Sequence, residues 1–109
     1  MSRYKLVLTE TADGKRDHGN HLGRREKAKR RAERDFGITV IDITESQVGS
    51  DWVYTWIVDD PTDSNVYALV KLFNWFGFVS CPGPIRVFSE KEESTMKDLI
   101  AKSKAAEKD

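Results

Sequence analysis

The amino-acid sequence predicts an α+β fold whose elements follow the order β-α-β-β-α-β, with one more helix at the C-terminal end. Short segments in which apolar and polar residues alternate indicate strands, and two segments with apolar residues at helical spacing lie between them. A Gly49-Ser50 pair between two strand-like segments indicates a hairpin. A chain of 109 residues suits a single domain, so residues 1–109 are expected to form one.

The first strand and the first helix are predicted over residues 3–9 and from about residue 20 or 21 to 35. Alternation in "RYKLVLT" gives the strand, and the turn formers that follow predict a loop with its tight point at Asp13-Gly14. Asn20 is a suitable N-cap for the helix, and Gly37 is a suitable C-terminal stop. The apolar seam of this helix is thin and consists of Leu22, Ala28, Ala32 and Phe36.

Two strands, 38–48 and 51–58, are predicted to form the hairpin. A two-residue turn places Val48 opposite Asp51, and directly opposite residues share a face of the sheet. The expected pairs on the face with the large rings are Trp52–Gln47, Tyr54–Glu45, Trp56–Ile43 and Val58–Ile41. Helices cover the more apolar face, so Trp56 is predicted to lie in the core, with Trp52 and Tyr54 grading to a half-exposed edge. A shift of one residue in register would reverse this assignment.

The second half of the chain predicts a helix, a short strand and a final helix. Val66, Leu69, Val70 and Phe73 have helical spacing, and Asp63 or Ser64 is expected to cap this helix; a strand over part of 64–76 is the rival interpretation. A proline-glycine turn leads to a strand at 85–88. Ser89 and Glu92 form a capping-box pattern that opens a helix through Met96, Leu99 and Ile100, and residues 102–109 are expected to fray.

This order of elements is that of the ferredoxin-like βαββαβ arrangement, an antiparallel sheet with two helices on one face. The extra C-terminal helix is expected to cover a sheet edge or part of the open face. Many unrelated functions use this arrangement, so function must be argued from particular residues.

Charge and cysteine content indicate the compartment and the kind of partner. The formal net charge is zero, but residues 1–37 carry 11 Lys and Arg against 6 Asp and Glu, so the positive charge is concentrated there. No apolar run approaches the ~20 residues that a membrane span needs, so no membrane partner is expected. One cysteine, Cys81, permits no internal disulfide, and a cytoplasmic location is therefore predicted.

Three groups of residues carry side chains that could form a metal or catalytic site. His18 and His21 supply only part of the three or four ligands of a metal site, and no nucleophile accompanies them. Asp59 and Asp60, with Asp63, could bind a divalent cation, but they also suit a helix-capping turn. Cys81 is expected to be a small buried residue rather than a nucleophile. We therefore expect no enzyme activity, no metal and no cofactor, with a metal- or carboxylate-dependent enzyme as the minor alternative.

The strongest functional signal is the basic helix, whose cations point away from the Ala28–Ala32 seam. The sequence predicts a non-catalytic regulatory module that binds an acidic surface of a protein partner. The alternative is a nucleic-acid-binding domain that uses the basic helix on phosphates and the sheet aromatics for base stacking. The sequence also allows a homodimer of this chain that pairs through an uncovered edge strand. The predicted partner-binding residues are Arg24, Lys27, Arg30, Arg31, Arg34, Trp52 and Tyr54.

Overall fold

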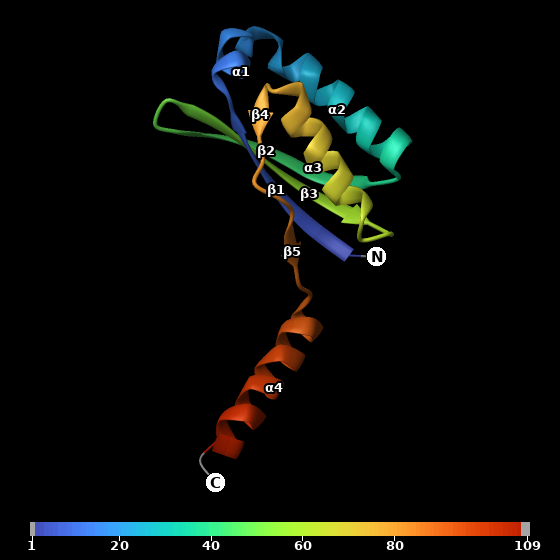
Figure 1. Ribbon diagram of the computed structural model, residues 1–109, viewed down its shortest axis with the longest axis vertical. Coiled ribbons are helices and arrows are strands. Elements are labelled where there is room, and N and C mark those ends of the chain that lie inside the picture. The colour runs from blue at the N-terminus through green and yellow to red at the C-terminus, as the bar shows by residue number, and fades with distance from the viewer. Residues whose placement is uncertain (1, 108–109) are drawn as a thin grey trace.

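The computed structural model describes residues 2–107 and has strands and helices joined by short connections (Figure 1). The strands are β1 (Ser2–Glu10), β2 (Thr39–Val48), β3 (Asp51–Asp60), β4 (Val79–Ser80) and β5 (Ile85–Val87). The helices are α1 (Ala12–Arg16), the 3-10 turn η1 (His18–Asn20), α2 (His21–Phe36), α3 (Asn65–Phe76) and α4 (Glu90–Glu107). Within these residues, no helix combines the length and the apolar character needed to cross a membrane.

The sheet is antiparallel throughout and is built around β1. Strand β3 pairs with one edge of β1, and β2 pairs with the outer edge of β3. The other edge of β1 carries two short strands, β4 beside Thr9 and Glu10 and β5 beside residues 3–5. The predicted α+β class and the antiparallel sheet are confirmed, the strand predicted at 85–88 is present as β5, and β4 was not predicted.

The hairpin register follows the prediction over most of its length. Val48 faces Asp51, and the pairs continue through Trp52–Gln47, Tyr54–Glu45 and Trp56–Ile43. The expected pair Val58–Ile41 is wrong, because a β-bulge at Ile41 places Val40 opposite Val58. The extra residue lets Val40 occupy the inner face while Ile41 turns toward solvent.

The inner face of the sheet forms the hydrophobic core with α2 and α3, which lie side by side over it (Figure 1). Alternate residues of β1 and β3 are buried, and Ala32 and Phe73 meet them from the two helices. Trp56 is buried as predicted, and its ring packs edge-to-face on Phe73 with the centroids 5.2 Å apart. Trp56 therefore belongs to the hydrophobic core.

Helix α3 is confirmed over the rival strand interpretation, because Val66, Leu69, Val70 and Phe73 are all buried on one side of it. Ser64 occupies the N-cap position as predicted, but its side chain makes no capping hydrogen bond. The buried Asp60 carboxylate accepts hydrogen bonds from the Val66 amide at 2.8 Å and from the Thr62 amide at 2.9 Å. A residue at the end of β3 thus fixes the start of the next helix.

The segment after β1 is helical, and the predicted loop is wrong there. The Thr11 hydroxyl accepts a hydrogen bond from the Gly14 amide and caps α1. Gly14 is buried so closely that a Cβ on it would lie 2.1 Å from the Phe78 carbonyl oxygen. Leu22 also departs from the predicted seam of α2, because it is exposed.

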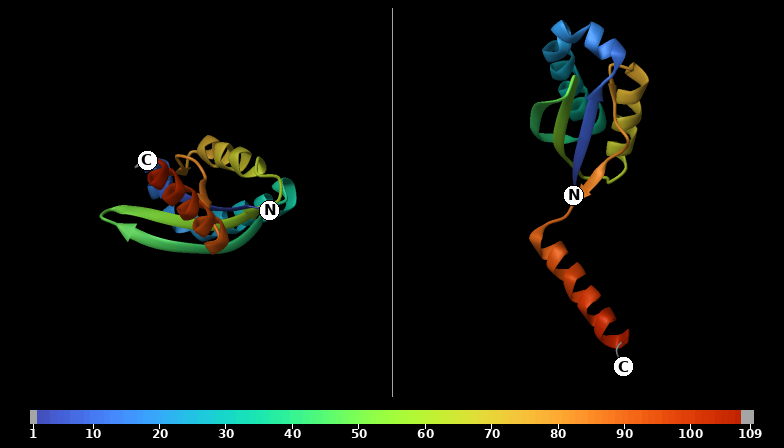
Figure 2. Two further views of the ribbon diagram at one scale, coloured as in Figure 1. Left: turned by 90° about the horizontal axis from the view of Figure 1, so that it is seen from below. Right: turned by 90° about the vertical axis from the view of Figure 1, so that its left-hand side faces the viewer.

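Helix α4 stands away from the body of the protein, and the expectation that it covers the sheet is wrong (Figures 1 and 2). Its predicted capping box is present, because the Glu92 amide donates to Ser89 Oγ and the Ser89 amide donates to Glu92 Oε1. The helix continues to Glu107 and buries none of its residues. The last two positions of the expected frayed segment, 108 and 109, lie outside the described residues.

Candidate functional site

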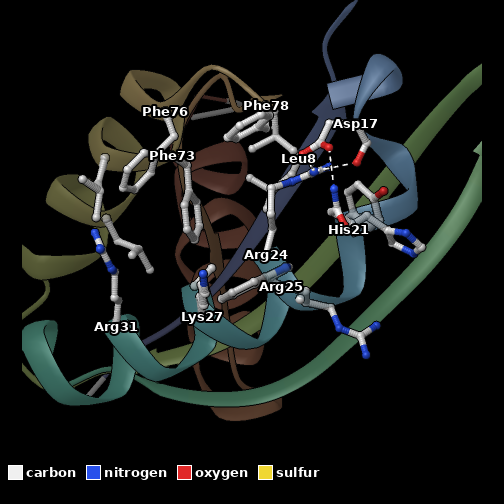
Figure 3. Close-up of a pocket in the computed structure, with 18 of the residues that line it drawn as sticks. Leu8, Asp17, His21, Arg24, Arg25, Lys27, Arg31, Phe73, Phe76 and Phe78 are labelled. Carbon is white, nitrogen blue, oxygen red and sulfur yellow. Dashed lines mark hydrogen bonds and ion pairs between the residues drawn. The ribbon is translucent and has the colours of Figure 1, made fainter. Parts of the chain in front are cut away.

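A groove of about 640 Å³ lies between α2 and α3, above the inner face of the sheet (Figure 3). One wall is cationic and carries Arg24, Lys27 and Arg31, which recur on α2 with the i, i+3, i+7 spacing of a single helical face. The opposite wall is aromatic and consists of Phe73, Phe76 and Phe78. We call this hollow the α2–α3 groove; its apolar floor comes from Leu8, Tyr54, Trp56 and Leu69.

The local sequence explains why the two helices leave a space between them. Ala32 is buried in the core, and Ala28, with its short side chain, lines the groove from α2. The longer apolar residue of the predicted seam, Leu22, is directed to solvent. The width between the helices is therefore spanned by cationic side chains, whose apolar stems lie beside the aromatic wall.

The charges of the cationic wall are only partly balanced. Arg24 donates to the Asp17 carbonyl and carboxylate and also lies over the Phe78 ring at 4.6 Å. Arg31 lies over the Phe76 ring at 5.3 Å. Within residues 2–107, no carboxylate lies within 4 Å of the charged groups of Lys27 or Arg31. Two positive charges thus remain available at the mouth of an apolar cavity.

The predicted basic face is divided into two parts. Arg24, Lys27 and Arg31 line the α2–α3 groove, whereas Arg30 and Arg34 do not. Together with Lys27 and Arg31, they border a second, shallow hollow on the outer side of α2. Arg34 is held by Asp35 at 2.7 Å, and this pair lowers the pKa of Asp35. Lys27 and Arg31 therefore line both hollows, whereas Arg24 lines only the α2–α3 groove and Arg30 and Arg34 only the outer hollow.

The two predicted hairpin aromatics lie in different surroundings. Trp52 is half-buried and stacks on His18 with the ring centroids 5.0 Å apart. Tyr54 is buried and lines the floor of the groove near His21 and Arg24. The structure consequently places Tyr54 in the same cavity as part of the basic helix, whereas the sequence indicated two separate surfaces.

A polar network under the hairpin was missed by the sequence analysis. The buried Glu10 carboxylate is contacted through Oε2 by His18 Nδ1 at 2.7 Å and by the Tyr54 hydroxyl at 3.1 Å. Burial and then the nearby Glu10 charge raise the pKa of Tyr54 to about 12. Among the described residues, Glu10 Oε1 is buried without a hydrogen-bond partner. One signal was available: alternation along β1 places Glu10 on the same face as Leu6 and Leu8.

The residues weighed for metal or nucleophilic chemistry have other contacts. His18 and His21 stack on each other at 4.2 Å instead of converging on a point. Asp59 pairs with Arg3, and Asp60 caps α3. Burial raises the pKa of the Cys81 thiol, which keeps it protonated. Within the described part of the chain, no group of three or more His, Cys, Asp or Glu residues could hold a metal ion.

No protein-family model matches this chain, and a comparison with curated protein sequences gives no significant match.

Proposed function

We propose that the protein is a small, non-catalytic binding module that takes an acidic, amphipathic segment of a protein partner into the α2–α3 groove. The observation that carries this proposal is the pairing of walls: cations on α2 face aromatic rings on α3 across an open cavity. A ligand that satisfies both walls must present carboxylates on one side and apolar side chains on the other. An acidic amphipathic helix has this arrangement.

The spacing of the cationic wall supports a helical ligand. Arg24 and Arg31 are seven residues apart, which corresponds to about 10 Å along the helix axis. Acidic residues at the same spacing on a partner helix would pair with Arg24, Lys27 and Arg31. Apolar residues on its adjacent face would reach Phe76 and Leu72, which line the opposite side of the groove. Aromatic residues and arginine are the side chains that most often dominate binding energy at interfaces.

An exposed ring extends the aromatic wall beyond the cavity. Trp75 is 78% exposed and packs edge-to-face on Phe76, with the centroids 5.3 Å apart. A large ring held on the surface by a neighbouring ring is a suitable anchor for a partner, because little side-chain freedom is left to lose on binding. Trp75 therefore replaces the buried Tyr54 as the aromatic contact residue in this proposal.

A nucleic-acid-binding function is the second candidate, favoured by the outer hollow. Lys27, Arg30, Arg31 and Arg34 gather there, and a row of cations on a helix can neutralise phosphates. Because Tyr54 is buried and Trp52 stacks on His18, base stacking would depend on Phe76 and Trp75. The two candidates therefore make different demands on the two sides of α2.

We also propose that the chain has the ferredoxin-like arrangement, with β4 and β5 as two pieces of its final strand. The sheet order β2-β3-β1 followed by β4 and β5, and the two helices over one face, support this assignment. The proposed location remains the cytoplasm. The proposed role is regulation of the partner by binding, without catalysis.

Two double variants test the proposed groove. The probe is a fluorescein-labelled, 18-residue helical peptide with glutamates at i, i+3 and i+7 and leucines on the adjacent face. Its binding to the protein is measured by fluorescence polarisation. Lys27→Glu with Arg31→Glu should weaken binding at least tenfold, or about 1.4 kcal/mol. Arg30→Glu with Arg34→Glu is the matched control, because it makes the same charge change on the outer side of α2, and it should alter binding far less.

Binding of single-stranded oligonucleotides is measured in parallel over a range of salt concentrations. Equal losses of peptide binding in both double variants would contradict a groove-specific site. The nucleic-acid candidate would replace the first one if the oligonucleotides bind with a steep, linear dependence on log salt while the peptide does not bind.

A further inference from the structure

Helix α4 presents apolar residues that no other element of the described chain covers. Met96 and Ile100 lie on one face of α4 with Glu93 and Glu107, at the spacing 93, 96, 100, 107, and Lys97 and Lys104 border this face. The apolar residues are exposed, Ile100 on this face by 54% and Leu99 beside it by 61%. Exposed apolar residues on a well-formed helix indicate a surface that another element covers.

The connection to α4 restricts where the helix can dock. Only Phe88 and Ser89 separate β5 from the first residue of α4, and β5 pairs with the N-terminal end of β1. The capping box fixes this junction, and the Arg86 guanidinium holds Glu92 at 3.2 Å. From there α4 extends away from α2 and α3 (Figures 1 and 2). A groove of a second molecule is therefore more accessible to α4 than the groove of its own chain.

We propose that α4 of a second copy of this chain occupies the α2–α3 groove, an inference that rests on the groove function proposed above. Glu93 of α4 pairs with the cationic wall, and Met96 and Ile100 meet the aromatic wall. When two copies exchange their α4 helices reciprocally, both grooves are filled and the assembly closes as a two-fold dimer. The exchanged helix then competes with any other acidic partner for the groove.

Sedimentation equilibrium of the full chain measures the dimer directly. At high concentration, the mass should approach twice the 12.5 kDa of one chain. Met96→Ser with Ile100→Ser removes the apolar contact without adding charge and should raise the dimer dissociation constant at least tenfold, or about 1.4 kcal/mol. Ala101→Ser with Ala105→Ser introduces the same hydroxyl groups on the opposite face of α4 and should leave the constant nearly unchanged. Circular dichroism establishes that α4 stays helical in both variants.

A mixing experiment identifies the surface on which α4 docks. Lys27→Glu with Arg31→Glu damages the groove and keeps α4 intact, whereas Met96→Ser with Ile100→Ser damages the apolar face of α4 and keeps the groove intact. Each variant alone should be monomeric, and a mixture should recover a heterodimer through its one intact groove–α4 contact.

Three results would overturn the proposal. The first is a wild-type chain that stays monomeric at every concentration. The second is a groove variant that dimerises like wild type, as pairing between α4 helices or between β2 edges would give. The third is a mixture that forms no heterodimer. Failure of the proposed function is distinguishable, since in each case the labelled acidic peptide can still be tested for binding to the wild-type groove.

Discussion

Replacing Asp60 by alanine should destabilise the fold strongly, because this carboxylate joins the end of β3 to the start of α3. Asp60 is fully buried and accepts hydrogen bonds from two backbone amides, those of Thr62 and Val66, as well as from the Thr62 hydroxyl. Burial by itself would raise the pKa of Asp60, but these hydrogen bonds outweigh it and hold the pKa below the ordinary value of 3.8.

The magnitude follows from the donors that would lose their acceptor. A buried donor left unsatisfied costs about 1–3 kcal/mol. The Val66 amide is buried and the Thr62 amide is only partly buried, so Asp60→Ala should lower the free energy of unfolding by about 2–4 kcal/mol. Small domains have only about 5–15 kcal/mol in total. Asp60→Asn retains one acceptor oxygen and should lose less.

Urea unfolding followed by tryptophan fluorescence measures this loss. Asp59→Ala is the matched control, because the neighbouring carboxylate makes a solvent-accessible ion pair with Arg3, and such a pair contributes little. Since the folded state holds the pKa of Asp60 low, its contribution is complete above pH 3.8 and is lost as the pH falls further. A loss at neutral pH no larger for Asp60→Ala than for Asp59→Ala would refute the reasoning.

Two further predictions concern Gly14 and Tyr54. Gly14→Ala should lower the free energy of unfolding by about 1–3 kcal/mol, because the added Cβ meets the Phe78 carbonyl oxygen. The control, Gly23→Ala, has open space around its Cβ and should be neutral or stabilising. Thermal unfolding compares the two variants, and equal effects would contradict the close approach at Gly14. Because the pKa of Tyr54 is raised from 10.0 to about 12, stability should decline as the pH rises between these values, and an alkaline urea series in which Tyr54→Phe declines as steeply as wild type would contradict this.

Local signals in the sequence were sufficient where a structural feature depends on neighbouring residues. The two-residue turn at Gly49-Ser50 fixed the hairpin register up to the bulge, and Ser89 with Glu92 fixed the start of α4. The bulge at Ile41 could not be read in this way, because two adjacent β-branched residues compete for one inward position. Helix α1 was missed because its sequence is rich in turn formers. Thr11, which caps this helix, also donates a hydrogen bond to the distant Gly77 carbonyl.

The candidate site was only partly predictable, because it depends on contacts between distant segments. The cations of α2 were recognised, but their division between the groove and the outer hollow depends on where α3 lies. The bond between Glu10 and Tyr54 joins residues 44 positions apart in the sequence. No pattern within β1 or β3 alone specifies that contact, although the inward position of Glu10 indicates that it needs a partner.

The separation of α4 from the body also changes the hydrodynamic behaviour of the protein. The radius of gyration is 17.4 Å, whereas a compact chain of this length has about 13 Å. A monomer with an extended helix therefore diffuses more slowly than a sphere of its mass, and it leaves a sizing column early. If each α4 docks into the groove of the other copy, neither helix projects from the dimer, so the Stokes radius of the dimer should be smaller than that of a dimer whose α4 helices stay extended.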